Sequence, residues 1–206
     1  MVKNQFHSLH LGDSYTIGEY VPRDQNWPSQ LSRQLSRKWG LVTQPTIIAQ
    51  TGWTTQDLLD ELNEANINRV FDLVSLMIGV NNQYQGLSLH DYKRDLKLLL
   101  DKSITYAGGE PSHVMVLSIP DWGITPYAND HDPSHIRSMI DAFNNIIQNM
   151  TGDFGGCWID ITGSSRNATS NPEMIAEDQL HPSSKLYTAW LERILPAARI
   201  ILTGNR

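Results

Sequence analysis

The stretch Leu73-Val-Ser-Leu-Met-Ile-Gly79 decides the fold. It is a nearly unbroken aliphatic run of strand length, which is typical of a strand buried on both faces of a parallel sheet. The glycine at its end favours a turn, and Val80-Asn81 brings a polar amide just beyond that turn. The segment therefore predicts a central parallel strand with a polar side chain at its carboxyl end.

Four further runs have strand length and strand-like composition. They are Phe6 to Leu11, Thr46 to Gln50, His113 to Ile119 and Cys157 to Ile161. Longer segments with helical periodicity separate them, so strand and helix alternate along the chain. This alternation predicts an α/β fold with a parallel sheet, helices on both faces and right-handed crossovers, and the active site of such a fold lies at the carboxyl ends of the strands.

The helical segments carry recognisable start and stop signals. Trp27, Leu31, Leu35 and Trp39 recur every fourth residue, with Pro28 near the start and Gly40 at the end. The expected N-caps of three later helices are Thr54 or Thr55, Ser88 and Ser134. A last helix, with Leu186, Trp190 and Ile194 on its apolar face, follows His181-Pro182.

Composition narrows the class of protein. The 206 residues fit one domain spanning 1–206, with a formal charge of -6 and no large Lys/Arg cluster, which argues against a nucleic-acid partner. No run approaches the roughly 20 apolar residues of an integral membrane segment, and no secretory signal is visible, so a cytoplasmic location is expected. The single Cys157 cannot form an internal disulfide. The oligomeric state stays open.

A candidate nucleophile lies at the end of the first strand. In Leu9-His-Leu-Gly-Asp-Ser14 a glycine precedes a hydroxyl at the turn, and Asp178 and His181 near the other terminus supply an acid and a base three residues apart. Pro182 biases His181 away from helical backbone. The alternative is that Asp178 and His181 only form the turn before the last helix.

Three donors are available for the oxyanion of an acyl-transfer intermediate. They are the backbone N–H of Ser14, the N–H of Gly52, and the side-chain amide of Asn81. The alternative for Gly52 and Gly79 is that each only permits a turn after a strand.

Four blocks together resemble the SGNH, or GDSL-type, hydrolase family. The blocks are Gly12-Asp-Ser-Tyr15, Gly52, Gly79-Val-Asn81 and Asp178-Gln-Leu-His-Pro-Ser183, in the family's order. The resemblance implies a flavodoxin-like three-layer α/β/α sandwich with five parallel strands. It also implies Ser14 as nucleophile, His181 as base, Asp178 as its orienting acid, and Ser14, Gly52 and Asn81 as the oxyanion hole.

Two departures from the family pattern are visible. Tyr15 replaces the leucine of the family's name, and Asn82 directly follows Asn81, although the Gly-x-Asn spacing selects Asn81. The Gly-x-Ser-x-Gly elbow of the α/β-hydrolases is absent around Ser14.

Other candidates are weaker. His131 and His135 have a metal-like spacing, but Pro133 interrupts the helix and no third ligand is evident, so no metal is expected. His10, lower on the first strand, is expected in the core or behind the site. The segment Pro120 to Pro133 is long for a connection, which suggests a functional loop or partial lid.

Four aromatic residues follow strand ends and are candidates for substrate binding. Trp53, Tyr84, Trp122 and Tyr127 either form the walls of a small apolar pocket or roof the core.

The sequence as a whole predicts a serine esterase that acts through an acyl-enzyme on Ser14 and requires no cofactor. The expected substrate is a small-molecule or lipid ester with a short acyl or acetyl group. The alternatives are a thioesterase or acyltransferase with the same triad, and a non-catalytic carbohydrate- or lipid-binding module of the same fold.

Overall fold

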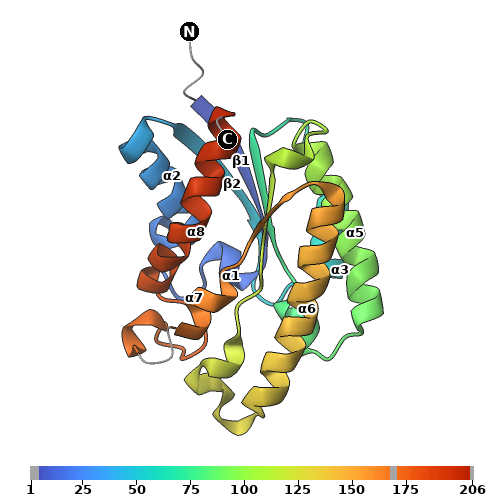
Figure 1. Ribbon diagram of the computed structural model, residues 1–206, viewed down its shortest axis with the longest axis vertical. Helices are drawn as coiled ribbons and strands as arrows, with labels where there is room; N and C mark the ends of the chain where they lie inside the picture. The colour runs from blue at the N-terminus through green and yellow to red at the C-terminus, as the bar shows by residue number, and fades with distance from the viewer. Residues whose placement is uncertain (1–4, 168–170, 205–206) are drawn as a thin grey trace.

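A five-stranded parallel sheet forms the centre of the molecule, in the order β2-β1-β3-β4-β5 (Figure 1). The computed structural model describes residues 5–167 and 171–204. The strands are β1 (Gln5–Gly12), β2 (Val42–Ala49), β3 (Leu73–Met77), β4 (Val114–Leu117) and β5 (Cys157–Ile159). This is the flavodoxin-like order, in which the chain changes direction across the sheet between β1 and β3.

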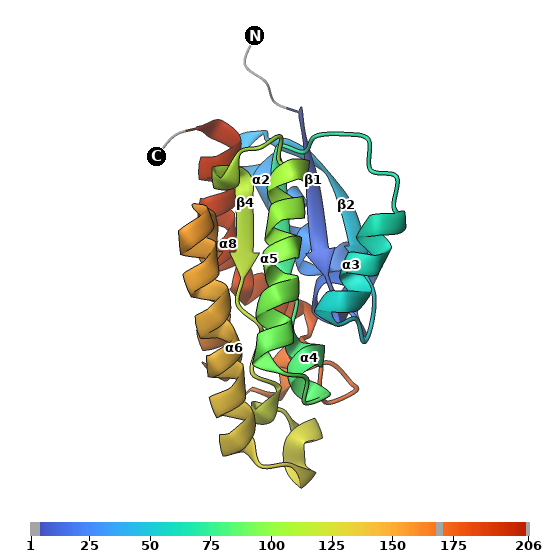
Figure 2. The same ribbon diagram turned by 90° about the vertical axis from the view of Figure 1, so that its right-hand side faces the viewer.

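Helices cover both faces of the sheet. In Figure 1, α2 (Trp27–Trp39) and α8 (Ser184–Thr203) lie on one side, and α3 (Thr55–Glu64), α5 (Leu89–Tyr106) and α6 (Pro133–Phe154) lie on the other. The view in Figure 2 looks onto the second helical layer, with the sheet behind it. The expected three-layer α/β/α sandwich is therefore confirmed.

Short elements lie in the connections between the strands and the longer helices. They are α1 (Ser14–Ile17), α4 (Val80–Tyr84), α7 (Thr162–Asn167), and the 3₁₀ turns η1 (Arg23–Gln25), η2 (Pro111–His113), η3 (Trp122–Ile124), η4 (Pro126–Asp130) and η6 (Pro172–Met174). The arrowheads of β1 and β4 in Figure 2 point toward the end of the molecule that carries α4. The turns that follow β1, β3 and β4 therefore meet at one end of the sheet.

Strand β3 is the buried centre that its composition predicts. All five of its residues are buried, and it pairs with β1 on one side and β4 on the other. Side chains alternate between the two faces of a strand, so burial at every position requires a helical layer on each face.

The edge strand β2 begins at Val42, four residues before the predicted start at Thr46. Most positions in its first half are exposed, so this half contains no continuous apolar run that would predict a strand. It also contains Pro45, which has no backbone N–H to donate and is tolerated because the strand lies at the edge of the sheet. The three later strands end before their predicted limits, because Ile78-Gly79, Ser118-Ile119 and Asp160-Ile161 already belong to the turns.

Most helix starts agree with the sequence. Thr54 caps α3 in a capping box with Asp57, and Ser88 caps α5. The prediction that Ser134 caps the next helix is wrong, because Asp132 is the N-cap of α6 and accepts hydrogen bonds from the backbone N–H groups of Ser134 and His135. Pro133 then occupies the first helical position, where it lacks only an N–H that would have no partner. Among residues 5–167 and 171–204, no helix is long and apolar enough to cross a bilayer.

Candidate active site

Ser14 is the first residue of α1, directly after β1. Asp13 is the N-cap and accepts a hydrogen bond from the Tyr15 backbone N–H through Oδ1. The turn is tight: a Cβ on Gly12 would collide with Thr16 Oγ1 and would lie 2.5 Å from the carbonyl oxygen of Met77. Only glycine lets strand and helix approach this closely, so Gly12 fixes where the Ser14 hydroxyl lies.

Asp178 and His181 lie on one compact turn ahead of α8. Asp178 Oδ1 accepts the backbone N–H groups of Leu180 (3.1 Å) and His181 (3.0 Å), while Oδ2 lies 2.5 Å from His181 Nδ1. Gln179 takes a left-handed backbone conformation, with φ of 65°, which closes the turn. Ser183 is the N-cap of α8. Asp178 and His181 therefore lie in the turn ahead of the helix, and neither of them is its N-cap.

The imidazole of His181 joins this turn to Ser14. Its Nε2 lies 2.9 Å from Ser14 Oγ, across 167 residues of sequence. A proton on Nδ1 donates to the Asp178 carboxylate, so Nε2 of the neutral ring accepts the Ser14 hydroxyl. The rings of Tyr15 and Tyr20 flank the imidazole at 5.3 and 6.3 Å between centroids. The Ser14 and His181 side chains are both buried, which shields the contact from bulk water.

The hydrogen bonds of Asp178 keep it charged. Burial raises the pKa of this carboxyl, but the His181 ring and the backbone N–H groups of His181 and Leu180 together outweigh burial, so its pKa lies below the ordinary value of 3.8. The carboxylate is thus negative throughout the neutral range, as a partner for a protonated imidazole must be.

Gly52 and Asn81 line the same pocket as Ser14. Gly52 has φ of 83°, a conformation that favours glycine, and the Thr51 hydroxyl beside it donates to the Glu19 carboxylate. Asn81 donates one side-chain N–H to the carbonyl oxygen of Trp53 at 2.9 Å, which leaves its second N–H for a ligand.

Asn82 has a different position. It is buried, and its side-chain amide accepts the Thr55 backbone N–H (3.0 Å) and donates to the Thr55 hydroxyl (2.8 Å). These bonds tie the start of α3 to α4. Asn81, as the Gly-x-Asn spacing predicts, is the asparagine that faces the pocket.

Asp13 does not compete with Asp178 as the acid beside His181. Its Oδ1 accepts the Tyr15 backbone N–H, and its Oδ2 is buried with no hydrogen-bond partner in the described part of the chain. Burial raises the pKa of Asp13 to about 7. A carboxyl that is half neutral at that pH is a poor partner for an imidazolium.

The pocket above Ser14 has a volume of about 140 Å³. Three of the four predicted aromatic residues, Tyr84, Trp122 and Tyr127, line it. Trp53 does not line it; its ring is half-buried against the core, and only its carbonyl contributes, through Asn81. The remaining wall residues, which the sequence did not indicate, are Tyr15, Thr51, Val80 and Leu180.

The segment 120–133 is built from two 3₁₀ turns and lies over this pocket. Trp122, in the first turn, is buried and donates through Nε1 to Gln83 Oε1 at 2.6 Å. Tyr127, in the second turn, donates its backbone N–H to the carbonyl oxygen of Gln179 at 3.1 Å, which joins this segment to the turn that carries His181.

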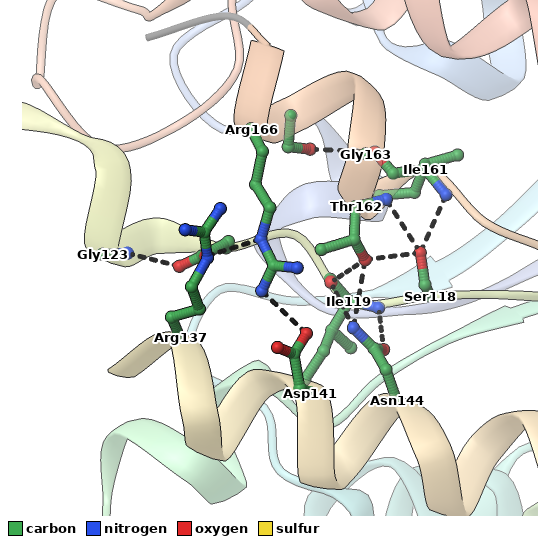
Figure 3. Close-up of polar contacts among 12 residues, drawn as sticks. Ser118, Ile119, Gly123, Arg137, Asp141, Asn144, Ile161, Thr162, Gly163 and Arg166 are labelled. Carbon is green, nitrogen blue, oxygen red and sulfur yellow. Dashed lines mark hydrogen bonds and ion pairs between the residues drawn. The ribbon is translucent and has the colours of Figure 1, made fainter. Parts of the chain in front are cut away.

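A polar network holds the base of the same segment. Asp121 Oδ2 accepts Arg166 Nε at 2.8 Å, and Arg166 also donates to Asp141 Oδ1 at 2.8 Å. Figure 3 shows Arg166 descending from α7 toward Arg137 and Asp141 of α6. Arg137 Nε lies 3.8 Å from the same oxygen of Asp121, whose side chain is only 1% exposed, so two cations face one buried carboxylate.

On the right-hand side of Figure 3, hydrogen bonds join the end of β4 to the segment after β5. The Ser118 hydroxyl oxygen accepts the backbone N–H groups of Ile161 (2.8 Å) and Thr162 (3.0 Å). Asn144 of α6 accepts the backbone N–H of Ile119 and donates to the Ile119 carbonyl. The chain therefore leaves β4 along a fixed path before it reaches Trp122.

The other histidines have separate surroundings. His10 is buried between Ser75 Oγ (2.8 Å) and Ser8 Oγ (3.0 Å), and burial lowers its pKa to about 3, so it is a neutral core residue as expected. His131 packs on Trp122 and stacks on Tyr127, while His135 belongs to α6. In the ranges 5–167 and 171–204, no group of three or more His, Cys, Asp or Glu side chains is placed to hold a metal ion.

Burial raises the pKa of the half-buried Cys157 thiol.

Comparison with solved structures agrees with this fold. The chain resembles TesA with a TM-score of 0.76 and 18% sequence identity, over 95% of this chain and 99% of that one. It resembles the acetylxylan esterase Axe2 from Geobacillus stearothermophilus with a TM-score of 0.71 and 19% identity, over 98% of this chain and 95% of that one. The psychrotrophic esterase EstA from Pseudoalteromonas sp. has a TM-score of 0.71 and 15% identity, over 96% of this chain and 97% of that one. A sequence comparison with curated proteins finds no match.

At these identities the structural likeness establishes the fold. The family is established by sequence, because the model of the GDSL-like lipase/acylhydrolase family matches residues 10–189. The chain belongs to the GDSL-like lipase/acylhydrolase family and is a carboxylic ester hydrolase.

Proposed function

We propose that the protein hydrolyses carboxylic esters of short acyl groups through an acyl-enzyme on Ser14. The observation that carries the proposal is the pair of contacts from Ser14 Oγ to His181 Nε2 (2.9 Å) and from His181 Nδ1 to Asp178 Oδ2 (2.5 Å), next to a pocket of about 140 Å³. A serine hydroxyl becomes nucleophilic when a neighbouring base accepts its proton, and a third group must hold that base in the right tautomer.

Acylation follows from these contacts. Ser14 Oγ bonds to the carbonyl carbon while its proton passes to His181 Nε2, and the carbonyl oxygen becomes negative. The N–H groups of Ser14, Gly52 and Asn81 donate to that oxygen, while the Asp178 carboxylate stabilises the imidazolium. Collapse of the intermediate breaks the bond to the alcohol oxygen, which leaves with the proton from His181.

Deacylation repeats the sequence with water. His181 Nε2 takes a proton from a water molecule, whose oxygen bonds to the acyl carbon. The second tetrahedral intermediate collapses, Ser14 Oγ leaves and recovers its proton from His181, and the carboxylic acid is released. The site ends as it began.

The pocket volume supports a short acyl group. A volume of about 140 Å³ lies below the roughly 300–1,000 Å³ of pockets that hold drug-sized ligands, so it suits a small group such as acetyl to butanoyl. Tyr84, Trp122 and Tyr127 supply apolar walls for such a group. The neighbour Axe2 is an acetylxylan esterase, which is in keeping with a small acyl group.

A panel of p-nitrophenyl esters tests the proposal. We expect kcat/KM to be highest for acetate to butanoate and to fall for octanoate, because longer chains exceed the pocket. Parallel arms contain acyl thioesters and acetate esters with competing alcohols, which reveal a thioesterase or acyltransferase. Lack of turnover on every ester, with no labelling of Ser14 by a fluorophosphonate, would contradict the proposal and favour a binding module.

Replacing Asn81 by alanine tests the oxyanion hole. We expect kcat to fall about 10²-fold to 10³-fold with KM little changed, because the lost N–H acts on the transition state. Asn81→Asp keeps the size of the side chain but replaces the donor by an acceptor, so it should lose at least as much.

The matched control for Asn81 is Asn145→Ala, at an exposed asparagine on α6. Steady-state kinetics on p-nitrophenyl acetate separate kcat from KM. A loss below about threefold in Asn81→Ala would exclude this side chain from the hole, since one such donor supplies far more.

A further inference from the structure

We infer that the contact between the Tyr84 and Tyr127 hydroxyls closes the outer wall of the pocket and limits the length of the acyl group. The two oxygens lie 3.0 Å apart, and both side chains line the pocket above Ser14. The inference rests on the proposed ester hydrolysis at Ser14, and it assigns acyl selectivity to one hydrogen bond.

The two tyrosines reach the pocket from different parts of the chain. Tyr84 ends α4, and Tyr127 lies in η4 of the segment after β4, 43 residues away. Both rings lie edge-on to Trp122, at 5.3 and 6.2 Å between centroids. Trp122 therefore forms the floor on which the tyrosine pair meets, and the pair bridges the two sides of the pocket.

Trp122, the floor of the pocket, is held in place, whereas the hydroxyl contact between Tyr84 and Tyr127, here called the tyrosine bridge, can open. Trp122 is 4% exposed and its Nε1–H is bound to Gln83 Oε1. Tyr84 and Tyr127 are 49% and 43% exposed, and one hydroxyl contact joins their tips. The Tyr127 backbone is anchored to Gln179, so opening needs no loop movement; it needs rotation of the exposed side chains, in which the Tyr127 ring leaves its stack on His131.

The acyl group, rather than the alcohol, faces this bridge. Tyr84 lies three residues after Asn81 on α4, so the two side chains share one side of the helix, and Asn81 donates to the oxygen on the acyl carbon. The leaving alcohol must receive its proton from His181 Nε2, and the exposed ring of Tyr20 stacks on that imidazole at 6.3 Å. The acyl chain therefore extends along α4 toward Tyr84, and the alcohol leaves past Tyr20.

The bridge persists at the pH at which a neutral imidazole works. The hydrogen bond with Tyr127, with a smaller contribution from burial, raises the pKa of Tyr84 above its ordinary value of 10.0. The Tyr84 phenol is therefore neutral at neutral pH, and it can share a hydrogen bond with the Tyr127 hydroxyl.

Four variants test the bridge: Tyr84→Phe, Tyr127→Phe, the double Phe variant and Tyr127→Ala. The readout is the ratio of kcat/KM for p-nitrophenyl octanoate to that for p-nitrophenyl acetate. Each single Phe variant should raise this ratio about threefold, because one hydrogen bond is lost while both rings stay. The double Phe variant should show no more than either single one, since both changes remove the same bond. Tyr127→Ala, which removes the wall itself, should raise the ratio tenfold or more.

Tyr106→Phe is the matched control, because it removes a tyrosine hydroxyl that donates to the Leu62 carbonyl, at 3.5 Å, on another part of the fold. A second arm varies the alcohol of acetate esters. Unchanged acyl ratios in all four variants, with acetate turnover kept, would overturn the inference and leave ester hydrolysis intact. A shift in the alcohol ratio instead would overturn it as well. Failure of the wild-type protein on all esters would refute the proposed function itself.

Discussion

Replacing Ser14 by alanine lowers the kcat of ester hydrolysis by an expected four to six orders of magnitude, about the loss that follows removal of a nucleophile that works with a base as one unit. The variant keeps the pocket and the oxyanion donors, so KM should change much less than kcat. The protein should stay folded, because the change removes the hydrogen bond between Ser14 Oγ and His181 Nε2 while alanine fits the same turn.

Three comparisons make this test specific. His181→Ala should lose a similar amount, and the double variant no more than either single one, since neither residue works without the other. Ser134→Ala, at an exposed serine of α6, is the control. A fluorophosphonate probe should label the wild-type protein and not Ser14→Ala. Substantial turnover in a purified, folded Ser14→Ala protein would exclude the acyl-enzyme mechanism.

The elements that the sequence predicted best are those whose local pattern of apolar residues is compatible with a single type of secondary structure. Strand β3 is apolar at nearly every position because helices cover both its faces, so composition alone identifies it. Strand β2 lies at the edge and is exposed at several positions, so its first half lacks any apolar signal and was missed. The start of α6 was misplaced by two residues, because two potential caps, Asp132 and Ser134, flank Pro133.

The candidate site was predictable because its residues lie at strand ends or within one short turn. Parallel strands bring Ser14, Gly52 and Asn81 to one edge whatever the side-chain details. The three-residue spacing of Asp178 and His181 allows their contact within a turn. The approach of His181 to Ser14 spans 167 residues, and only the fold and the family resemblance indicated it.

The contacts that shape the pocket had no local signal. Tyr84 and Tyr127 are 43 residues apart, Gln83 and Trp122 are 39 apart, and Asp121 and Arg166 are 45 apart. That an aromatic residue follows the end of a strand also does not determine whether its ring points into the pocket or toward the core. Trp53 and Tyr84 follow neighbouring turns, yet the first packs against the core and the second lines the pocket.

Asp178→Asn is expected to lower kcat about 10⁴-fold with the protein folded, because the amide fits the same turn but reverses the tautomer of His181. An amide N–H donates to Nδ1, so the ring proton moves to Nε2, which can no longer accept the proton of Ser14. Glu177→Gln, the same type of change at the exposed neighbouring residue, is the control and should keep full activity. A loss below about tenfold would show that another group orients the imidazole.

The same variant predicts a change in how stability depends on pH. A carboxyl whose pKa is lowered on folding stabilises the fold above its unfolded pKa, near 3.8, and loses that contribution as the pH falls through the folded value. The difference in Tm between the wild-type protein and Asp178→Asn should therefore be constant through neutral and mildly acidic pH and shrink only below 3.8, whereas Glu177→Gln should follow the wild type throughout. A Tm difference that disappears already near pH 6 would mean that Asp178 is not held charged by His181, and the acid of the site would have to be sought elsewhere.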